Sequence, residues 1–164
     1  MRLARPVLMY VVWAMLAAPP SAPPSAADRA ALAEVNAARR ATGAPPFAWD
    51  ERLANAARMA TAKGQDYHED FRARVQRSGF PMKETPGRRP PRVRGETLLN
   101  VAEGSFPLAS SPTGDLAGLL KMMQTTMAKG PHAQDFRDPY FNKIGISRGS
   151  RGKDGAFVVL IYGR

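Results

Sequence analysis

The chain has 164 residues, no cysteine, and 24 Lys and Arg against 14 Asp and Glu, which gives a net charge of +10 at pH 7. This length suits one domain with a core large enough to fold without cross-links. The absence of cysteine excludes disulfides, thiolate metal ligands and a catalytic thiol. The basic surplus points to anionic partners.

The first 27 residues have the layout of an export signal. Arg2 and Arg5 precede an apolar run over residues 7–18, which is too short to span a bilayer comfortably, and the Ser-Ala-Ala of residues 25–27 fits a cleavage site. We therefore expect a signal peptide at 1–27 and a secreted or periplasmic domain at 28–164, with an uncleaved N-terminal anchor as the alternative. Cleavage would remove two arginines and no acid and so lower the net charge from +10 to +8. We expect the mature chain to be a monomer without a stable membrane span.

The first half of the chain predicts two long helices. The first covers about residues 29–41 with Asp28 as its N-cap, and it ends before a glycine and two prolines. The second begins after Asp50, and its helical spacing of apolar and small residues continues to Tyr67. That spacing would place His68 on the edge of the apolar face.

The next segments alternate between helix and irregular chain. A short helix is expected over 71–77, followed by irregular chain that recovers order at 95–104 and loosens again at 105–114. Asp115 or Thr113 would cap another helix, whose leucines and methionines recur at three and four as core residues do. Gly130 and Pro131 would end it and leave His132 in the following loop.

The end of the chain predicts two strands, 143–147 and 156–162, joined by a turn. The second is apolar at every position, which indicates a central strand that is covered by helices on both faces. With helices first and strands later, the predicted fold class is α+β, a three-layer α-β-α sandwich.

Residues 83–95 form the most basic segment. They contain one acid, Glu84, and five basic residues: Lys83, Arg88, Arg89, Arg92 and Arg94. One interpretation is a solvated loop rich in proline and glycine. The other is an anion-binding loop, carried by Arg88, Arg89, Arg92 and Arg94, for surface glycans or lipid headgroups. Nucleic acid is not expected, because aromatic residues do not alternate with the basic ones.

Sequence motifs exclude several classes of enzyme. The residue four after His68 is Arg72, so the paired histidines of a zinc-protease helix are missing. The chain lacks the phosphate-binding glycine loop and the G-x-G-x-x-G fingerprint. Only two histidines occur, His68 and His132, so a site with three histidines cannot form.

Several pieces in order along residues 30–162 resemble the CAP, or SCP-like, extracellular domains. The stretch LAEVNAARRATGAPPFAWDERLANAA is similar to the family's opening, an Asn-x-x-Arg helix, a Gly-x-x-Pro turn and a Trp-Asp before an alanine-rich helix. KGPHAQDFRDPYFNKIGIS is similar to its Ser-Pro-Gly-His and Ile-Gly-Val block. The matching positions are Asn36, Arg39, Gly43, Pro46, Trp49, Asp50, His68, Ser78-Gly79-Phe80, Gly95-Glu96-Thr97-Leu98 and His132.

The resemblance implies an α-β-α sandwich in which His68, Glu96 and His132 line one cleft. Many relatives add a second glutamate from the helix before the second histidine, but residues 116–131 hold no carboxylate here. The cluster is therefore at most a set of three. Two imidazoles and a carboxylate could hold a divalent cation such as zinc, although they could equally hydrogen-bond within a polar cleft.

Three functions follow as alternatives from this resemblance. The favoured one is a non-enzymatic binding module whose cleft or basic loop engages molecules of a cell envelope or host surface. The second is a metal-assisted hydrolase, in which His68, His132 and Glu96 would be the catalytic candidates. The third is a carrier of sterols or fatty acids. No organic cofactor is expected.

Overall fold

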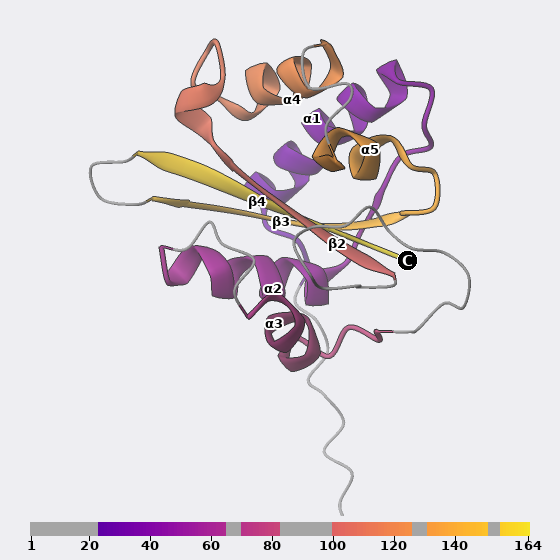
Figure 1. The fold of residues 1–164 in the computed structure, drawn as a ribbon, viewed down its shortest axis with the longest axis vertical. Helices are drawn as coiled ribbons and strands as arrows, with labels where there is room; N and C mark the ends of the chain where they lie inside the picture. The colour runs from indigo at the N-terminus through magenta and orange to yellow at the C-terminus, as the bar shows by residue number, and fades with distance from the viewer. Residues whose placement is uncertain (1–22, 65–69, 83–99, 126–130, 151–154) are drawn as a thin grey trace, which may run out of the picture.

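The computed structural model describes residues 23–64, 70–82, 100–125, 131–150 and 155–164. A four-stranded mixed sheet of order β1-β3-β4-β2 forms the middle layer. Helices α1, α4 and α5 lie on one face and α2 and α3 on the other (Figure 1). The elements are α1 (Ala26–Ala41), β1 (Ala48–Trp49), α2 (Glu51–Ala62), α3 (Phe71–Arg77), β2 (Val101–Pro107), a 3-10 turn (Leu108–Ser110), α4 (Leu116–Thr125), α5 (Pro131–Arg137), β3 (Lys143–Ser150) and β4 (Ala156–Gly163).

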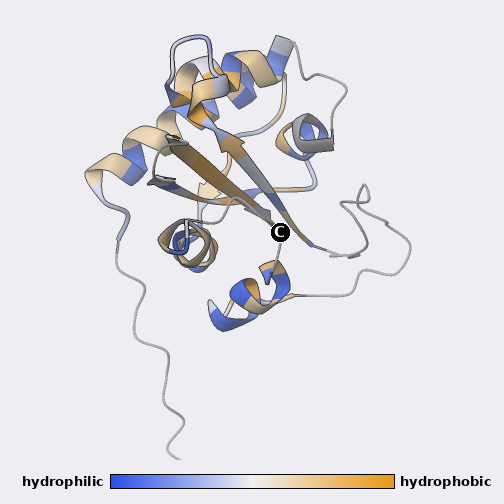
Figure 2. Ribbon diagram, turned by 60° about the vertical axis from the view of Figure 1, so that its left-hand side comes forward, coloured by the Kyte–Doolittle hydropathy of each residue, from blue (hydrophilic) through white to orange (hydrophobic). Residues whose placement is uncertain are grey.

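Strand β4 lies between β3 and β2 and contributes side chains to the core on both faces of the sheet. Its even-numbered residues, such as Leu160 and Tyr162, pack with α1 and α4, whereas odd-numbered ones, such as Ile161, pack with α2 and α3. All three are fully buried. Successive side chains of a strand point to opposite faces of the sheet, so a strand that is apolar at every position needs both faces covered. Figure 2 shows the apolar strands enclosed by helices. The prediction of a central strand and a three-layer α+β fold is confirmed.

Two strands were not predicted. The segment expected to loosen at residue 105 instead forms β2, which pairs antiparallel with β4 along its whole length, from Val101 opposite Gly163 to Pro107 opposite Phe157. Strand β1 is only two residues long and pairs parallel with β3. Glycine, serine and proline in β2 weaken the alternation signal, so its strand character comes from pairing with β4 rather than from its own sequence.

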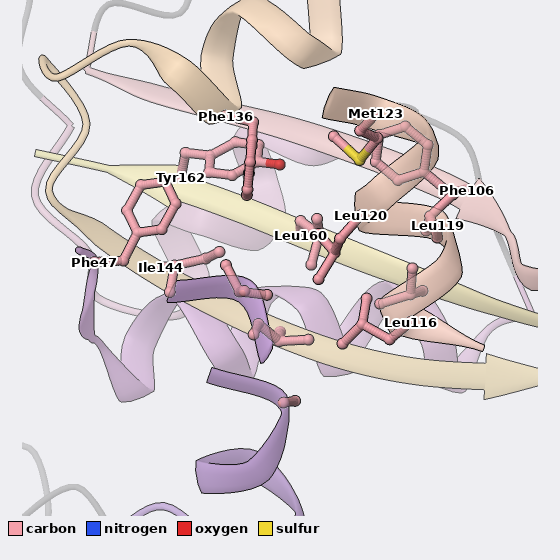
Figure 3. Packing of buried hydrophobic residues seen from close by; sticks show 14 of the residues in the cluster. Phe47, Phe106, Leu116, Leu119, Leu120, Met123, Phe136, Ile144, Leu160 and Tyr162 are labelled. Atoms are coloured by element: carbon pink, nitrogen blue, oxygen red, sulfur yellow. The ribbon is translucent and has the colours of Figure 1, made fainter. Parts of the chain in front are cut away.

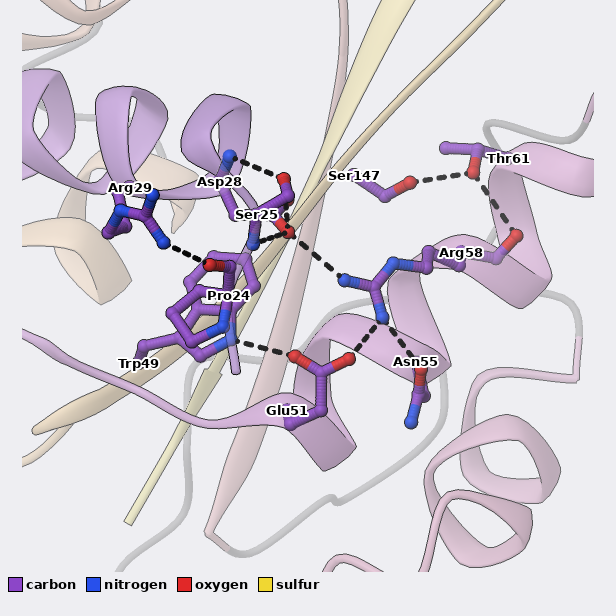
Figure 4. Close-up of polar contacts among 10 residues, drawn as sticks. All are labelled: Pro24, Ser25, Asp28, Arg29, Trp49, Glu51, Asn55, Arg58, Thr61 and Ser147. Carbon is purple, nitrogen blue, oxygen red and sulfur yellow. Dashed lines mark hydrogen bonds and ion pairs between the residues drawn. The ribbon is translucent and has the colours of Figure 1, made fainter. Parts of the chain in front are cut away.

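Helix α1 begins three residues earlier than predicted. Ser25, rather than Asp28, is the N-cap, and the two residues form a capping box in which Ser25 Oγ accepts from Asp28 N at 3.1 Å and Asp28 Oδ2 accepts from Ser25 N at 3.0 Å. Asp28 Oδ2 also pairs with Arg58 of α2 at 3.3 Å, so the start of α1 is tied to the neighbouring helix (Figure 4). Residues 25–27, predicted to belong to the signal peptide, therefore contribute the first turn of the folded domain.

Helix α2 ends earlier than predicted and lies directly on the sheet. Asp50 caps it by accepting from Arg52 N, but the helix stops at Ala62, before Gly64 with a φ of +62°. The helix thus ends before His68, which was predicted on the edge of its apolar face and lies outside the described residues. Gly145 of β3 permits the close packing, since a Cβ at that position would lie 2.0 Å from Ala54 N.

The shorter helices agree with the predictions at α3 and at the start of α4, while the predicted end of α4 near Gly130 lies outside the described residues. Helix α3 matches its predicted bounds, and Asp115 caps α4 by accepting from Gly118 N at 2.8 Å. His132 was expected in a loop but is the second residue of α5, whose Pro131 suits the first helical position. Among the helices that the structure describes, none is both long and apolar enough to cross a bilayer.

Candidate functional site

Most of the predicted site residues lie outside the described ranges. This applies to His68, Glu96 and the four arginines of the basic segment, Arg88, Arg89, Arg92 and Arg94. The backbone of His132 lies in α5, while its side chain is not described. The meeting of the two histidines with Glu96 in one cleft therefore remains a prediction.

The zinc set remains a prediction for the same reason. Within residues 23–64, 70–82, 100–125, 131–150 and 155–164, no three His, Asp or Glu side chains lie close enough to hold a metal ion. The proposed ligands His68 and Glu96 are outside these ranges, so we assign no metal-dependent step to the residues that the structure describes.

Arg39 of α1 fixes the backbone around α5. Its side chain is fully buried, and its guanidinium donates to four carbonyl oxygens. The partners are Pro45 O, Phe136 O at 2.7 Å, Asp138 O at 3.0 Å and Phe141 O at 2.7 Å. One side chain thus joins the turn after α1 to the end of α5 and to the connection that leads into β3.

The environment of Arg39 is apolar on its remaining side. Its guanidinium carbon lies 3.6 Å from the centre of the Phe47 ring, in a cation–π contact. Burial lowers the pKa of Arg39 to about 10, and the nearby Tyr162 and Asp138 offset part of that decrease. The guanidinium therefore stays charged at neutral pH, and its hydrogen bonds are charge-assisted.

Two buried polar groups, one on α5 and one on β4, were missed in the sequence. Asp135 is only 2% exposed, and burial, followed by the charge of Asp138, raises the pKa of Asp135 to about 7. Tyr162 of β4 is fully buried, and its hydroxyl has no hydrogen-bond partner among the described residues. Figure 3 shows Tyr162 beside Phe136, the residue that follows Asp135. The only sequence signal was the aromatic residue Phe136 directly after Asp135.

The electrostatic interaction between these groups shows that they share one environment. Burial raises the pKa of Tyr162 far above its ordinary value, the charge of Asp135 raises it further, and Arg39 opposes both. A carboxyl group with a pKa near 7 in such surroundings can hold or release a proton at neutral pH. This chemistry lies on the helix that carries His132, one turn away from that residue.

The opposite layer holds a buried ion pair, which was also missed. Arg74 of α3 donates through Nη2 to both carboxylate oxygens of Glu103 on β2 at 2.8 Å, and through Nη1 to Ala56 O at 3.1 Å. The side chains are 1% and 2% exposed. The Glu103 carboxylate is thus bound to an internal cation and faces α3 rather than α5.

The two ends of the basic segment are held at one end of the sheet. Asn100, just before β2, donates its side-chain amide to Pro81 O at 2.9 Å and to Arg164 O at 3.4 Å. Pro81 precedes the segment and Asn100 follows it, so a hydrogen bond joins the described residues on either side of residues 83–99.

A buried ring at this end of the sheet has cationic neighbours. The centre of the Phe80 ring lies 5.2 Å from the Arg52 guanidinium carbon and 5.8 Å from Lys143 Nζ. Arg52 is also paired with Asp50 at 2.6 Å. Burial alone would raise the pKa of Asp50, but the hydrogen bonds and charge of Arg52 outweigh it, so that pKa lies below its usual value. Lys143 therefore adds positive charge beside Phe80.

The residues that carry the family resemblance in the described ranges stabilise the scaffold. Asn36 donates to Phe47 O at 3.0 Å and accepts from Phe47 N at 2.8 Å, which fixes the turn between α1 and β1. Gly43 in that turn has a φ of +79°, a conformation that glycine adopts without strain. Trp49 donates its indole N–H to Glu51 at 2.9 Å. These residues position the sheet and helices, but none of them is part of the predicted cleft.

The sheet with helices on both faces defines this chain as an α-β-α sandwich of the α+β class. A comparison with family models identifies the family: the model of the CAP, or cysteine-rich secretory protein, family matches residues 32–162. The chain therefore belongs to the CAP family, although it contains no cysteine. No curated protein and no solved structure matches it.

Proposed function

We propose that the chain is an exported, non-enzymatic CAP-domain binding protein that attaches to anionic cell-surface molecules through its basic segment. The supporting observation is the charge distribution. Residues 83–95 hold five basic residues and one acid, and the residues on either side of the segment are joined by the bond from Asn100 to Pro81 O. Positive charges this dense in sequence can contact several phosphate or carboxylate groups together.

The acidic residues of the fold do little to neutralise this segment. Asp28, Asp50, Glu51, Asp70 and Glu103 each pair with an arginine or lysine within the described ranges. Asp28 and Glu51 share Arg58, so these five acids are paired with four cations and most of their negative charge is balanced locally. The predicted cleft of His68, Glu96 and His132 would then act as a recognition pocket for the attached molecule.

Binding to two anionic materials tests the proposal and distinguishes lipid headgroups from a soluble polyanion as the partner. Vesicles of phosphatidylcholine with and without phosphatidylglycerol report lipid headgroups, and immobilised heparin reports a soluble polyanion. The protein should bind at least one anionic material, and binding should weaken steeply as salt rises, because exposed charges are screened within about 10 Å at 0.1 M salt. No binding to either at low salt would refute the proposal.

A matched pair of variants locates the contact. Changing Arg88, Arg89, Arg92 and Arg94 to glutamine should abolish most binding. The control changes four exposed basic residues on helices to glutamine: Arg40, Arg72, Arg77 and Lys121. Both variants lose the same charge, so equal weakening would indicate a non-specific charge effect and would refute attachment through the loop.

The metal-assisted hydrolase is a separate prediction with its own test. Elemental analysis of the dialysed protein would show one divalent ion per chain, and His132→Ala would lose it. The absence of a stoichiometric ion after incubation with zinc would remove this alternative and leave the anion-binding proposal unaffected.

A further inference from the structure

Helix α5 is held on the sheet by contacts that leave one carboxyl group inside the protein. Arg39 binds the carbonyl oxygens of Phe136 and Asp138, and Arg137 donates to Gln124 O of α4 at 2.5 Å. Arg39 thus bonds to oxygens at the end of α5, whereas Arg137 bonds to an oxygen of α4. Asp135 directly precedes Phe136 and has 2% of its surface exposed.

The charged and titratable groups around Asp135 do not favour its ionised form. Within the described ranges, no basic side chain forms an ion pair with it. Tyr162 of β4 and Asp138 of the connection to β3 interact electrostatically with Asp135. A negative charge on Asp135 would repel the Asp138 carboxylate and would disfavour ionisation of Tyr162. Arg39 of α1 acts on Tyr162, while the charge of Arg137 is directed to α4. His132 belongs to the same helix.

Burial therefore decides the protonation state. An ionised carboxyl group inside an apolar layer, without a paired cation, costs several kcal/mol. The protein can avoid this cost by keeping the proton on Asp135 or by moving α5 so that the carboxylate reaches water. Release of α5 would break the bonds from Arg39 and expose Phe136, but it would leave the pairing of β4 with β3 and β2 in place, because α5 takes no part in the sheet.

We propose that α5 is a pH-dependent latch, which lies on the sheet while Asp135 carries a proton and is released when Asp135 ionises. The helix carries His132, so the latch would control the position of one of the two predicted cleft histidines. It does not depend on the basic segment, and the anion-binding proposal can fail without affecting it.

The direction of the pH effect follows from the raised pKa of Asp135. The pKa of Asp135 rises from an ordinary value of 3.8 to about 7 when α5 is seated. The seated helix thus binds more protons than the released one between about pH 4 and pH 7. Seating should be fully favoured below about pH 4, should weaken as pH rises through this range, and should be constant above about pH 7.

Hydrogen exchange of the α5 backbone provides the test. The N–H of Asp138 donates to Gln134 O at 2.8 Å in the last turn, so its protection reports whether the helix is formed. Compared at each pH with Asp135→Asn, which keeps the shape but cannot ionise, wild-type protection should fall about tenfold per pH unit between pH 5 and 7. The ratio should level off above pH 7. A ratio that is constant from pH 5 to 8 would overturn the latch.

A second variant keeps the test valid if Asp135→Asn does not fold. Asp138→Asn removes the neighbouring charge but keeps the oxygen that accepts from Tyr140 N at 2.8 Å. It should move the pH at which protection levels off to a lower value, because the charge of Asp138 contributes to the raised pKa of Asp135. An unchanged pH dependence in this variant would contradict the proposed electrostatic cause.

Discussion

Replacing Arg74 with methionine would leave the Glu103 carboxylate buried without its cation. The wild-type pair has two contacts of 2.8 Å from Arg74 Nη2 to the carboxylate, and both side chains are almost fully enclosed. Removing one partner of such a pair costs about 3–5 kcal/mol, because the remaining charge stays desolvated. Since a domain of this size has about 5–15 kcal/mol of stability, this single change would remove a large part of it.

Urea unfolding of four proteins measures the effect as a double-mutant cycle. The proteins are the wild type, Arg74→Met, Glu103→Leu and the double variant, all at pH 7. Each single variant should be destabilised by about 3–5 kcal/mol, whereas the double variant should recover at least about 2 kcal/mol of the summed loss, because neither charge is then buried. Additive losses, with a coupling below about 0.5 kcal/mol, would refute the view that these two groups depend on each other.

Three further changes test the packing at other points. Gly145→Ala should cost at least about 3 kcal/mol in urea unfolding, because the added Cβ would overlap the backbone of Ala54 and neither backbone can move aside. A loss below about 1 kcal/mol would contradict this packing argument. Arg39→Lys should cost about 2–4 kcal/mol in the same assay, since an ammonium cannot reach four carbonyls; wild-type stability would show that the guanidinium geometry is unimportant. A chain that begins at Asp28 should be about 1 kcal/mol less stable by thermal unfolding than one that begins at Pro24, because it lacks the Ser25 cap; equal stability would contradict the role of the capping box.

The sequence predicted the parts of the fold that depend on local patterns. The apolar run of β4 and the helical spacing in α4 each require a covered face, and this was enough to predict the three layers. Boundaries depend on weaker local effects. Ser25 and Asp28 are both good capping residues, and the choice between them depends on the reciprocal hydrogen bonds and on Arg58 of another helix.

The buried polar groups could not be predicted in the same way. Arg74 and Glu103 are 29 positions apart in sequence, and each has an ordinary place on an amphipathic element when considered alone. Asp135 differs from a surface aspartate only because Arg39 and the connection to β3 hold its helix against Tyr162. The resemblance identified Arg39 as a matching position but gave no reason for its burial. Tertiary contacts of this kind become visible only when segments far apart in sequence are brought together.

The four bonds of Arg39 also set an order for folding. Three of its carbonyl partners lie 97, 99 and 102 positions further along the chain. A nascent chain that has formed α1 but has not yet released residues 136–141 has nothing to receive this guanidinium, and burying it unsatisfied would be strongly unfavourable. Completion of the core should therefore wait until synthesis has passed this point, so that shorter translation intermediates stay open and accessible to chaperones.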